Sequence, residues 1–155
     1  MARYFLESSA LVKRYKQEPG TDVVDRLFDS GAQLFYLNLA LIEVRKVFYR
    51  LWKYPFPAEK AAQLDEPAFR ALESALARDL QRMKPIVFTD EMLEQAISIL
   101  DTVWLKSAFD LAQLGAYLVA RDEYPNLVLV CADERSNLLE AARELVDEKD
   151  VLVPK

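Results

Sequence analysis

Short apolar runs alternate with amphipathic stretches along the whole chain. The runs have the length of buried strands, and the stretches between them partly follow the three- and four-residue apolar spacing of a helix. Strands are predicted at residues 3–6, 34–37, 86–88, 127–131 and 151–153. Helices are predicted at about residues 8–16, 21–30, 39–53, 90–99, 106–121 and 133–146. Because strands that alternate with helices form parallel pairs, this order predicts a parallel sheet covered on both faces, in a three-layer α/β/α domain.

Proline and small polar residues divide these elements. Asn38 precedes the third helix, and its side chain is expected to cap that helix. The segment Tyr54-Pro55-Phe56-Pro57 ends the same helix. The charged stretch that follows, residues 58–83, is predicted to be helical with a restart at Pro67. Residues 54–84 are therefore expected to form a helical excursion, an arm or hairpin, within a single domain that spans residues 1–155.

The composition is that of a globular protein. The chain has 155 residues, of which 52% are hydrophobic, and this suits one domain with a proper core. The longest apolar runs, such as LVLVCA, are far too short to cross a bilayer, and the N-terminus lacks the apolar region of a signal peptide. Cys131 is the only cysteine, so no internal disulfide can form. These features predict a cytoplasmic protein.

The chain contains no histidine, which narrows the chemistry. Ser-His-Asp and Cys-His nucleophile systems, zinc sites with imidazole ligands and histidine acid–base catalysis are all excluded. Oxygen ligands remain, and they select hard cations such as Mg²⁺ or Mn²⁺. The formal net charge of −5 argues mildly against a generic nucleic-acid binder. Acids gathered in a metal site would nevertheless lower this total while lysines and arginines still lined a groove.

Four acidic residues in short apolar contexts are the candidate chemical groups: Glu7, Glu43, Asp110 and Asp133. Glu7 and Asp133 follow predicted strands, at the sheet edge where ligands of parallel sheets collect. Glu43 and Asp110 lie on apolar helix faces. Because an ionised carboxylate with apolar neighbours needs a compensating cation or donor, four of them on separate elements predict a divalent-metal site. Gln113, one turn after Asp110, could hydrogen-bond a water on that ion or a phosphate.

Each acid taken alone has another explanation. Asp133 could cap the following helix, and Glu7 could be a surface residue after an edge strand. Glu43 could be a buried structural carboxylate paired with an arginine, and Asp110 could pair with Lys106 on a helix surface. The combination favours a metal site, and oxygen-rich metal sites suit phosphodiester hydrolysis.

Four segments resemble the motifs of PIN domains, a family of metal-dependent ribonucleases. YFLESSALVKRYKQEPG resembles the opening motif, in which a strand, an acid and a helix follow one another. LNLALIEVRKVFYRL resembles the second motif, with its helical Glu, and SAFDLAQLGAYLVA the third, with an Asp on an amphipathic helix. LVLVCADERSNLLEAAREL resembles the fourth, with an acid just past a strand. Together they cover most of the chain outside residues 54–84.

The resemblance implies a PIN-like fold with a mostly parallel five-stranded sheet. It also implies a Mg²⁺- or Mn²⁺-dependent endoribonuclease that leaves a 3′-hydroxyl and a 5′-phosphate, similar to the toxin half of VapBC toxin–antitoxin pairs. Such toxins commonly form homodimers and bind a small antitoxin protein that blocks the site. Carried over residue by residue, the resemblance gives a catalytic metal site made of Glu7, Glu43, Asp110 and Asp133. Ser8 would support this site, and Glu134 could add a contact.

Three positions depart from the family pattern. Glu7 stands where the family usually has Asp, and its side chain is one methylene longer. Cys131 stands where Thr or Ser is common, and Gln113 stands where His is common.

The basic residues Lys13, Arg14 and Arg45 are candidate contacts for RNA phosphates, although a solvated helix face would look the same in the sequence. A third class of function, a phosphatase with an aspartyl nucleophile, is disfavoured because it needs an Asp at the strand end and a second acid two residues later. The chain has Glu7 and Ser9 at those places.

A non-catalytic PIN-fold protein that acts through protein binding is the alternative function. Its interface would consist of aromatic residues in the third helix and just after it, which are Phe48, Tyr49, Trp52, Tyr54 and Phe56. The same aromatics could instead pack in the core or under the helical arm.

Overall fold

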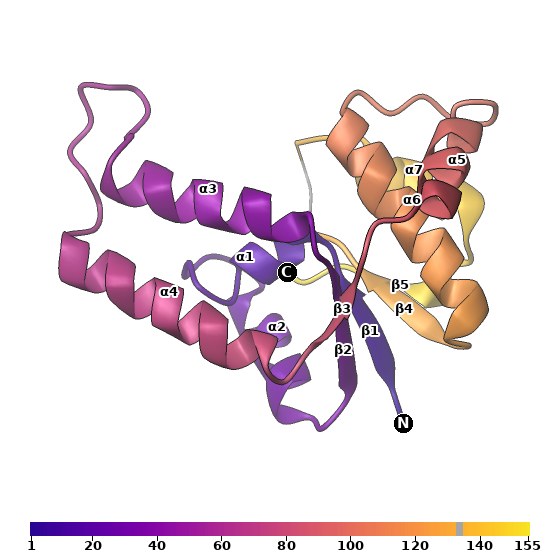
Figure 1. The fold of residues 1–155 in the computed structure, drawn as a ribbon, viewed down its shortest axis with the longest axis horizontal. Helices are drawn as coiled ribbons and strands as arrows, with labels where there is room; N and C mark the ends of the chain where they lie inside the picture. Colours follow the sequence, from indigo (N-terminus) through magenta and orange to yellow (C-terminus); the bar gives the residue numbers. More distant parts are fainter. Residues whose placement is uncertain (133–134) are drawn as a thin grey trace.

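Five parallel strands form one sheet at the centre of the molecule (Figure 1). The computed structural model describes residues 1–132 and 135–155. The strands are β1 (Arg3–Leu6), β2 (Gln33–Leu37), β3 (Lys84–Ile86), β4 (Leu127–Val130) and β5 (Val151–Leu152). Their order in the sheet is β3-β2-β1-β4-β5, and all neighbouring pairs are parallel. The central strand is β1, in which Phe5 lies in register with Phe35 of β2 and Leu129 of β4.

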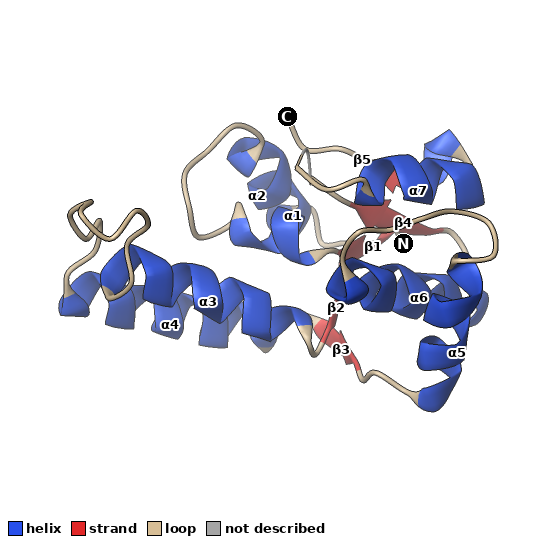
Figure 2. Cartoon of the chain, turned by 90° about the horizontal axis from the view of Figure 1, so that it is seen from above, coloured by secondary structure: helices blue, strands red, loops and turns tan. Residues whose placement is uncertain are grey.

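Helices cover both faces of this sheet (Figure 2). The helices are α1 (Ser8–Val12), α2 (Thr21–Asp29), α3 (Ala40–Trp52), α4 (Glu66–Leu80), α5 (Asp90–Ile99), α6 (Ala108–Glu123) and α7 (Leu138–Leu145). Successive strand side chains point to opposite faces, so the strands supply two separate cores. Phe5 and Leu129 pack with residues of α5, α6 and α7, whereas Leu6 and Val130 pack with residues of α1 to α4. The three-layer α/β/α architecture predicted from the sequence is confirmed.

Helices α3 and α4 form an arm that projects from the sheet (Figure 1). Phe69 of α4 holds the arm together, because its ring stacks on Trp52 of α3 with 4.2 Å between centroids. The helix predicted over residues 58–83 begins later, at Glu66, and residues 53–65 connect α3 to α4 without forming a helix. The start is set by Asp65, whose side chain accepts the N–H of Ala68.

Other features also differ from the sequence prediction. Helix α1 ends at Val12, whereas the predicted helix runs to about residue 16. Strand β3 ends at Ile86, where the predicted strand begins. Asn38 does not cap α3 as expected: its Oδ1 accepts the N–H groups of Leu39 and Phe88, and so ties the end of β2 to the chain after β3. Helix α7 begins at Leu138. No helix in the part of the chain that the structure describes is long and apolar enough to span a membrane.

Candidate functional site

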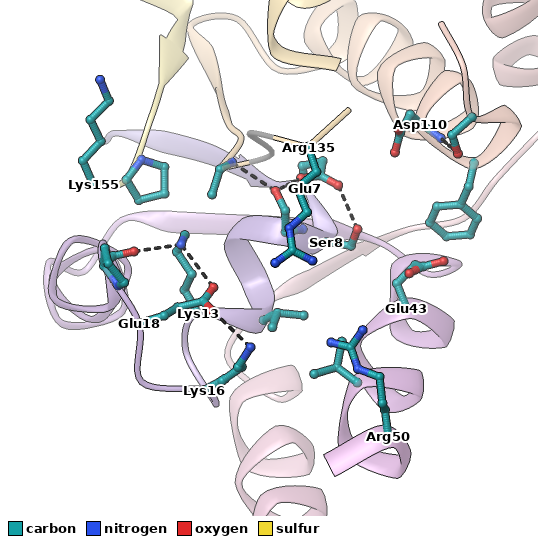
Figure 3. Close-up of a pocket in the computed structure, with 18 residues that line it drawn as sticks. Glu7, Ser8, Lys13, Lys16, Glu18, Glu43, Arg50, Asp110, Arg135 and Lys155 are labelled. Carbon is teal, nitrogen blue, oxygen red and sulfur yellow. Dashed lines mark hydrogen bonds and ion pairs between the residues drawn. The ribbon is translucent and has the colours of Figure 1, made fainter. Parts of the chain in front are cut away.

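A pocket of about 580 Å³ opens at the carboxyl ends of the two central strands. Strands β1 and β4 are held together there, because the N–H of Glu7 donates to the carbonyl of Val130 over 3.0 Å. Side chains from α1, α3, the start of α6 and the C-terminal residues complete the walls (Figure 3). The pocket therefore lies where an open parallel sheet places its ligands.

Three of the four predicted acids line this pocket. Glu7 and Asp110 are buried, with 1% and 8% of their surface exposed, and Glu43 is half-buried. They come from three elements that are separate in the sequence: the end of β1, α6 and α3. The fourth predicted acid, Asp133, and the supporting residue Glu134 lie outside the described residues. Within residues 1–132 and 135–155, no group of three or more Asp, Glu, Cys or His side chains is arranged to hold a metal ion.

The carboxylate of Glu7 is enclosed by hydrogen-bond donors. Its Oε1 accepts from Ser8 Oγ and from Gln113 Nε2, each over 2.8 Å. Its Oε2 accepts from the backbone N–H of Ser9 over 3.0 Å and from the Ser9 hydroxyl. Each oxygen thus receives two donors, which uses the acceptor capacity of the group. Glu7 thereby also caps the N-terminus of α1, because its side chain accepts the N–H of Ser9.

Burial raises the pKa of Glu7 above its usual value, because desolvation penalises the charged form. The hydrogen bonds from Ser9 and Ser8 oppose this shift, and the negative charge of Asp110 adds to it.

Ser8 and Gln113, the two described residues predicted to support the site, belong to the same network. The N–H of Ser8 donates to Gln113 Oε1 over 2.9 Å, and Gln113 Nε2 donates to Ser8 Oγ over 3.0 Å as well as to Glu7. Gln113 is 1% exposed. Its amide therefore bonds to Glu7 and Ser8 inside the protein, whereas its place in the sequence had suggested that it could bond to a metal-bound water or a phosphate.

The three predicted phosphate contacts are all engaged in ion pairs or hydrogen bonds within the protein. Lys13 lines the pocket, but its Nζ lies 3.1 Å from Glu18 Oε1 and 2.7 Å from the carbonyl of Pro19. Arg14 is held in ion pairs with Asp79 and Asp25, and Arg45 in one with Glu73.

Four basic residues that the sequence analysis did not single out also line the pocket: Lys16, Arg50, Arg135 and Lys155. Arg50 could have been predicted from the sequence, because it lies two helical turns after Glu43 and therefore on the same face of α3. Arg135 lies two residues after Asp133, in the segment that resembles the fourth motif, so its position in the sequence already indicated the site. Lys155 gives no such indication, because only the tertiary fold brings the C-terminal segment to the pocket. In Figure 3, Glu43 and Asp110 lie on one side of the pocket, and Lys13, Lys16 and Lys155 on the other.

Comparison with known proteins gives a likeness of structure and none of sequence. No family model matches the chain, and no curated protein matches it. The structure is similar to that of VapBC2 from Rickettsia felis bound to a DNA fragment from their promoter, with a TM-score of 0.57 and 11% identity over 97% of this chain and 96% of that one. It is also similar to PAE2754 from Pyrobaculum aerophilum, with a TM-score of 0.55 and 19% identity over 90% of this chain and 79% of that one. The chain thus has the PIN-like three-layer fold that its motifs indicated.

Proposed function

We propose that the protein is a metal-dependent endoribonuclease, the toxin component of a toxin–antitoxin pair, which hydrolyses RNA phosphodiester bonds. The observation that carries this proposal is the meeting of Glu43 and Asp110, from two separate helices, in one pocket at the carboxyl ends of β1 and β4. A PIN-like fold and a structural likeness to a VapBC2 complex support it.

Mg²⁺ or Mn²⁺ is the cofactor of this proposal. Mg²⁺ is usually bound through one or two carboxylates and keeps several waters, so it needs no cage of protein ligands. Asp110 and Glu43 supply two such carboxylates, with Asp133 as a further ligand in the proposal. A bound ion of this kind activates water and stabilises charge on the leaving oxygen of a phosphodiester. Glu43 and Asp110 would orient it from the pocket walls formed by α3 and α6.

RNA phosphates flanking the scissile bond would contact the basic side of the pocket. Lys16 and Lys155 lie across the pocket from Glu43 and Asp110, and Arg50 follows Glu43 along α3 (Figure 3). A chain with a net charge of −5 can bind a polyanion in this way, because the cations are gathered where the backbone would run.

An antitoxin protein is the proposed partner at the pocket, where it would block access of RNA.

A second copy of the chain is the proposed partner at α5. This helix has two apolar faces: Met92, Ala96 and Ile99 are buried, whereas Leu93 and Ile97 are exposed one turn apart. Acidic residues flank the exposed face, and residues 89–105 contain no lysine or arginine. Helix α3 offers the complement, with exposed Ile42 and basic Lys46 one turn apart.

The non-catalytic alternative is not favoured. Of its five proposed interface aromatics, Phe48 is buried in the core, and Tyr49 and Trp52 pack on Phe69 of α4. Only Tyr54 and Phe56 are left largely exposed, which is a small surface for a dedicated interface.

Cleavage of single-stranded RNA by the purified protein with added Mn²⁺ tests the proposal. Asp110→Asn and Glu43→Gln should each reduce the rate by more than about 100-fold, since loss of a ligand exceeds the usual effect of losing an outer-shell partner. Asp122→Asn is the matched control, because Asp122 is exposed on the same helix about 18 Å from Asp110. Equal rates in all four proteins would show that the pocket acids have no catalytic role.

A further inference from the structure

The buried contact between Glu7 and Gln113 joins two of the positions at which the chain departs from the PIN pattern. The orientation of the Gln113 amide follows from its neighbours: its Oε1 accepts the N–H of Ser8, so its Nε2 must face the Glu7 carboxylate. Gln113 Nε2 donates to Glu7 Oε1 over 2.8 Å and to Ser8 Oγ over 3.0 Å. A carboxylate on β1's end thus meets an amide on α6 with every donor matched to an acceptor.

We infer that Glu7 and Gln113 form a closed, hydrogen-bonded pair that positions the pocket acids, and that Glu7 is a positioning residue and not a ligand of the metal. Both oxygens of Glu7 already accept two hydrogen bonds each. A cation could bind Glu7 only after displacing a donor of Ser8, Ser9 or Gln113, and the buried donors of Ser8 and Gln113 would then lack partners. The ligand part of this inference rests on the proposed metal-dependent function, whereas the pairing does not.

The pair acts on the pocket through α6. Gln113 lies one turn after Asp110 on that helix, so clamping Gln113 to Glu7 and Ser8 fixes the rotation of α6 and keeps Asp110 at the pocket wall. Ser9 extends the network in the other direction. Its hydroxyl donates to Glu7 Oε2 and accepts the N–H of Ala132 over 3.0 Å, and Ala132 directly precedes Asp133 in the sequence.

Exchanging the two side chains gives a sharp test, because the pair can be inverted without changing the net charge. In Glu7→Gln, two amide donors would face each other at this contact. In Gln113→Glu, two carboxylates would face each other. In the double variant, the new amide at position 7 would donate to the new carboxylate at position 113. The Ser8 N–H and the Ser9 donors would keep acceptors.

We therefore expect each single variant to melt about 5 °C or more below the wild type, and the double variant to recover most of that loss. The inference is overturned if either single variant is as stable as the wild type, or if the double variant is no more stable than the worse single one. A double variant that fails to fold counts as the latter result.

Calorimetric titration with Mn²⁺ decides whether Glu7 is a ligand. The double variant should bind Mn²⁺ within about threefold of the wild-type affinity, since outer-shell partners that remain satisfied keep the ligands in place. Asp110→Asn should lose binding. If the double variant is folded and loses binding as Asp110→Asn does, Glu7 is a ligand and the inference fails. If the wild type binds no Mn²⁺, the proposed function fails, and the melting temperatures still decide the pairing.

Discussion

Gly20 lies against the carbonyl of Pro154, so closely that a Cβ built on Gly20 would be 2.5 Å from that oxygen. The backbone of Gly20 has a φ of +92°, in the region that glycine tolerates best. This contact seats the C-terminal segment beside the loop before α2, and it brings Pro154 and Lys155 to the wall of the pocket.

Replacing Gly20 should therefore loosen one side of the pocket. Gly20→Ala is expected to destabilise the protein by about 1–3 kcal/mol, from the positive φ together with the clash, in urea unfolding monitored by circular dichroism. Gly31→Ala is the matched control, because Gly31 has a φ of +75° but open space where its Cβ would be. The two variants would be equally stable if the contact with Pro154 contributed nothing.

The projecting arm should depend on Phe69. This side chain is fully buried between α3 and α4, where it contacts Trp52 and Tyr49. Phe69→Ala removes a buried ring, and we expect a loss of about 3–5 kcal/mol in the free energy of unfolding. Phe56→Ala, at a side chain that is 83% exposed in the connection between the helices, should change it by less than about 0.5 kcal/mol. Similar losses in both variants would contradict the packing described for the arm.

The buried Tyr117 predicts how stability changes at alkaline pH. Burial raises the pKa of Tyr117 to about 12, and its hydroxyl donates to the carbonyl of Leu127 over 2.9 Å. The unfolded chain releases this proton near pH 10, so between pH 10 and about 12 the unfolded state binds fewer protons and the free energy of unfolding falls as pH rises.

Tyr117→Phe removes this titration together with the hydrogen bond. Below pH 10 the variant should be less stable than the wild type by about 1 kcal/mol, and this difference should shrink as pH rises above 10. Tyr54→Phe, at an exposed side chain, should follow the wild type throughout. A difference between wild type and Tyr117→Phe that is constant with pH would show that Tyr117 ionises equally in the two states.

The exposed face of α5 predicts a dimer that charge can disrupt. Ile97 is 60% exposed in the single chain, and burying it against a second copy removes apolar surface from water. Ile97→Lys should shift the mass measured by analytical ultracentrifugation from dimer to monomer at micromolar protein. Gln81→Lys adds the same charge at an exposed position at the end of α4 and should leave the mass unchanged. A wild-type protein that sediments as a monomer would contradict the proposed homodimer.

The strands and most helices could be predicted from the sequence because their signals are local. Apolar runs such as Leu127 to Val130 are typical of buried parallel strands. Thr89 and Ser107 cap α5 and α6, because their side chains accept backbone N–H groups of the first turn. The start of α4 was misplaced because charged residues with helical composition stand on both sides of Asp65, and only that cap separates them.

The arrangement of the site could be predicted only in part from the sequence. Apolar neighbours correctly indicated that Glu7 and Asp110 are buried, and both line the same pocket. The ion pairs of Arg14 with Asp79 and of Arg45 with Glu73 could not be predicted, because these acids belong to α4, which is distant in the sequence. The hydrogen bond from Gln113 to Glu7 could not be predicted for the same reason, because it joins α6 to the end of β1, which is distant in the sequence.

The most direct test is a crystal of the protein soaked in Mn²⁺, with the anomalous scattering of the ion used to locate it. The account predicts a peak in the pocket at coordination distance from the carboxylates of Asp110 and Glu43. An ion bound elsewhere, or a clear map with no peak between these two side chains at millimolar Mn²⁺, would contradict it.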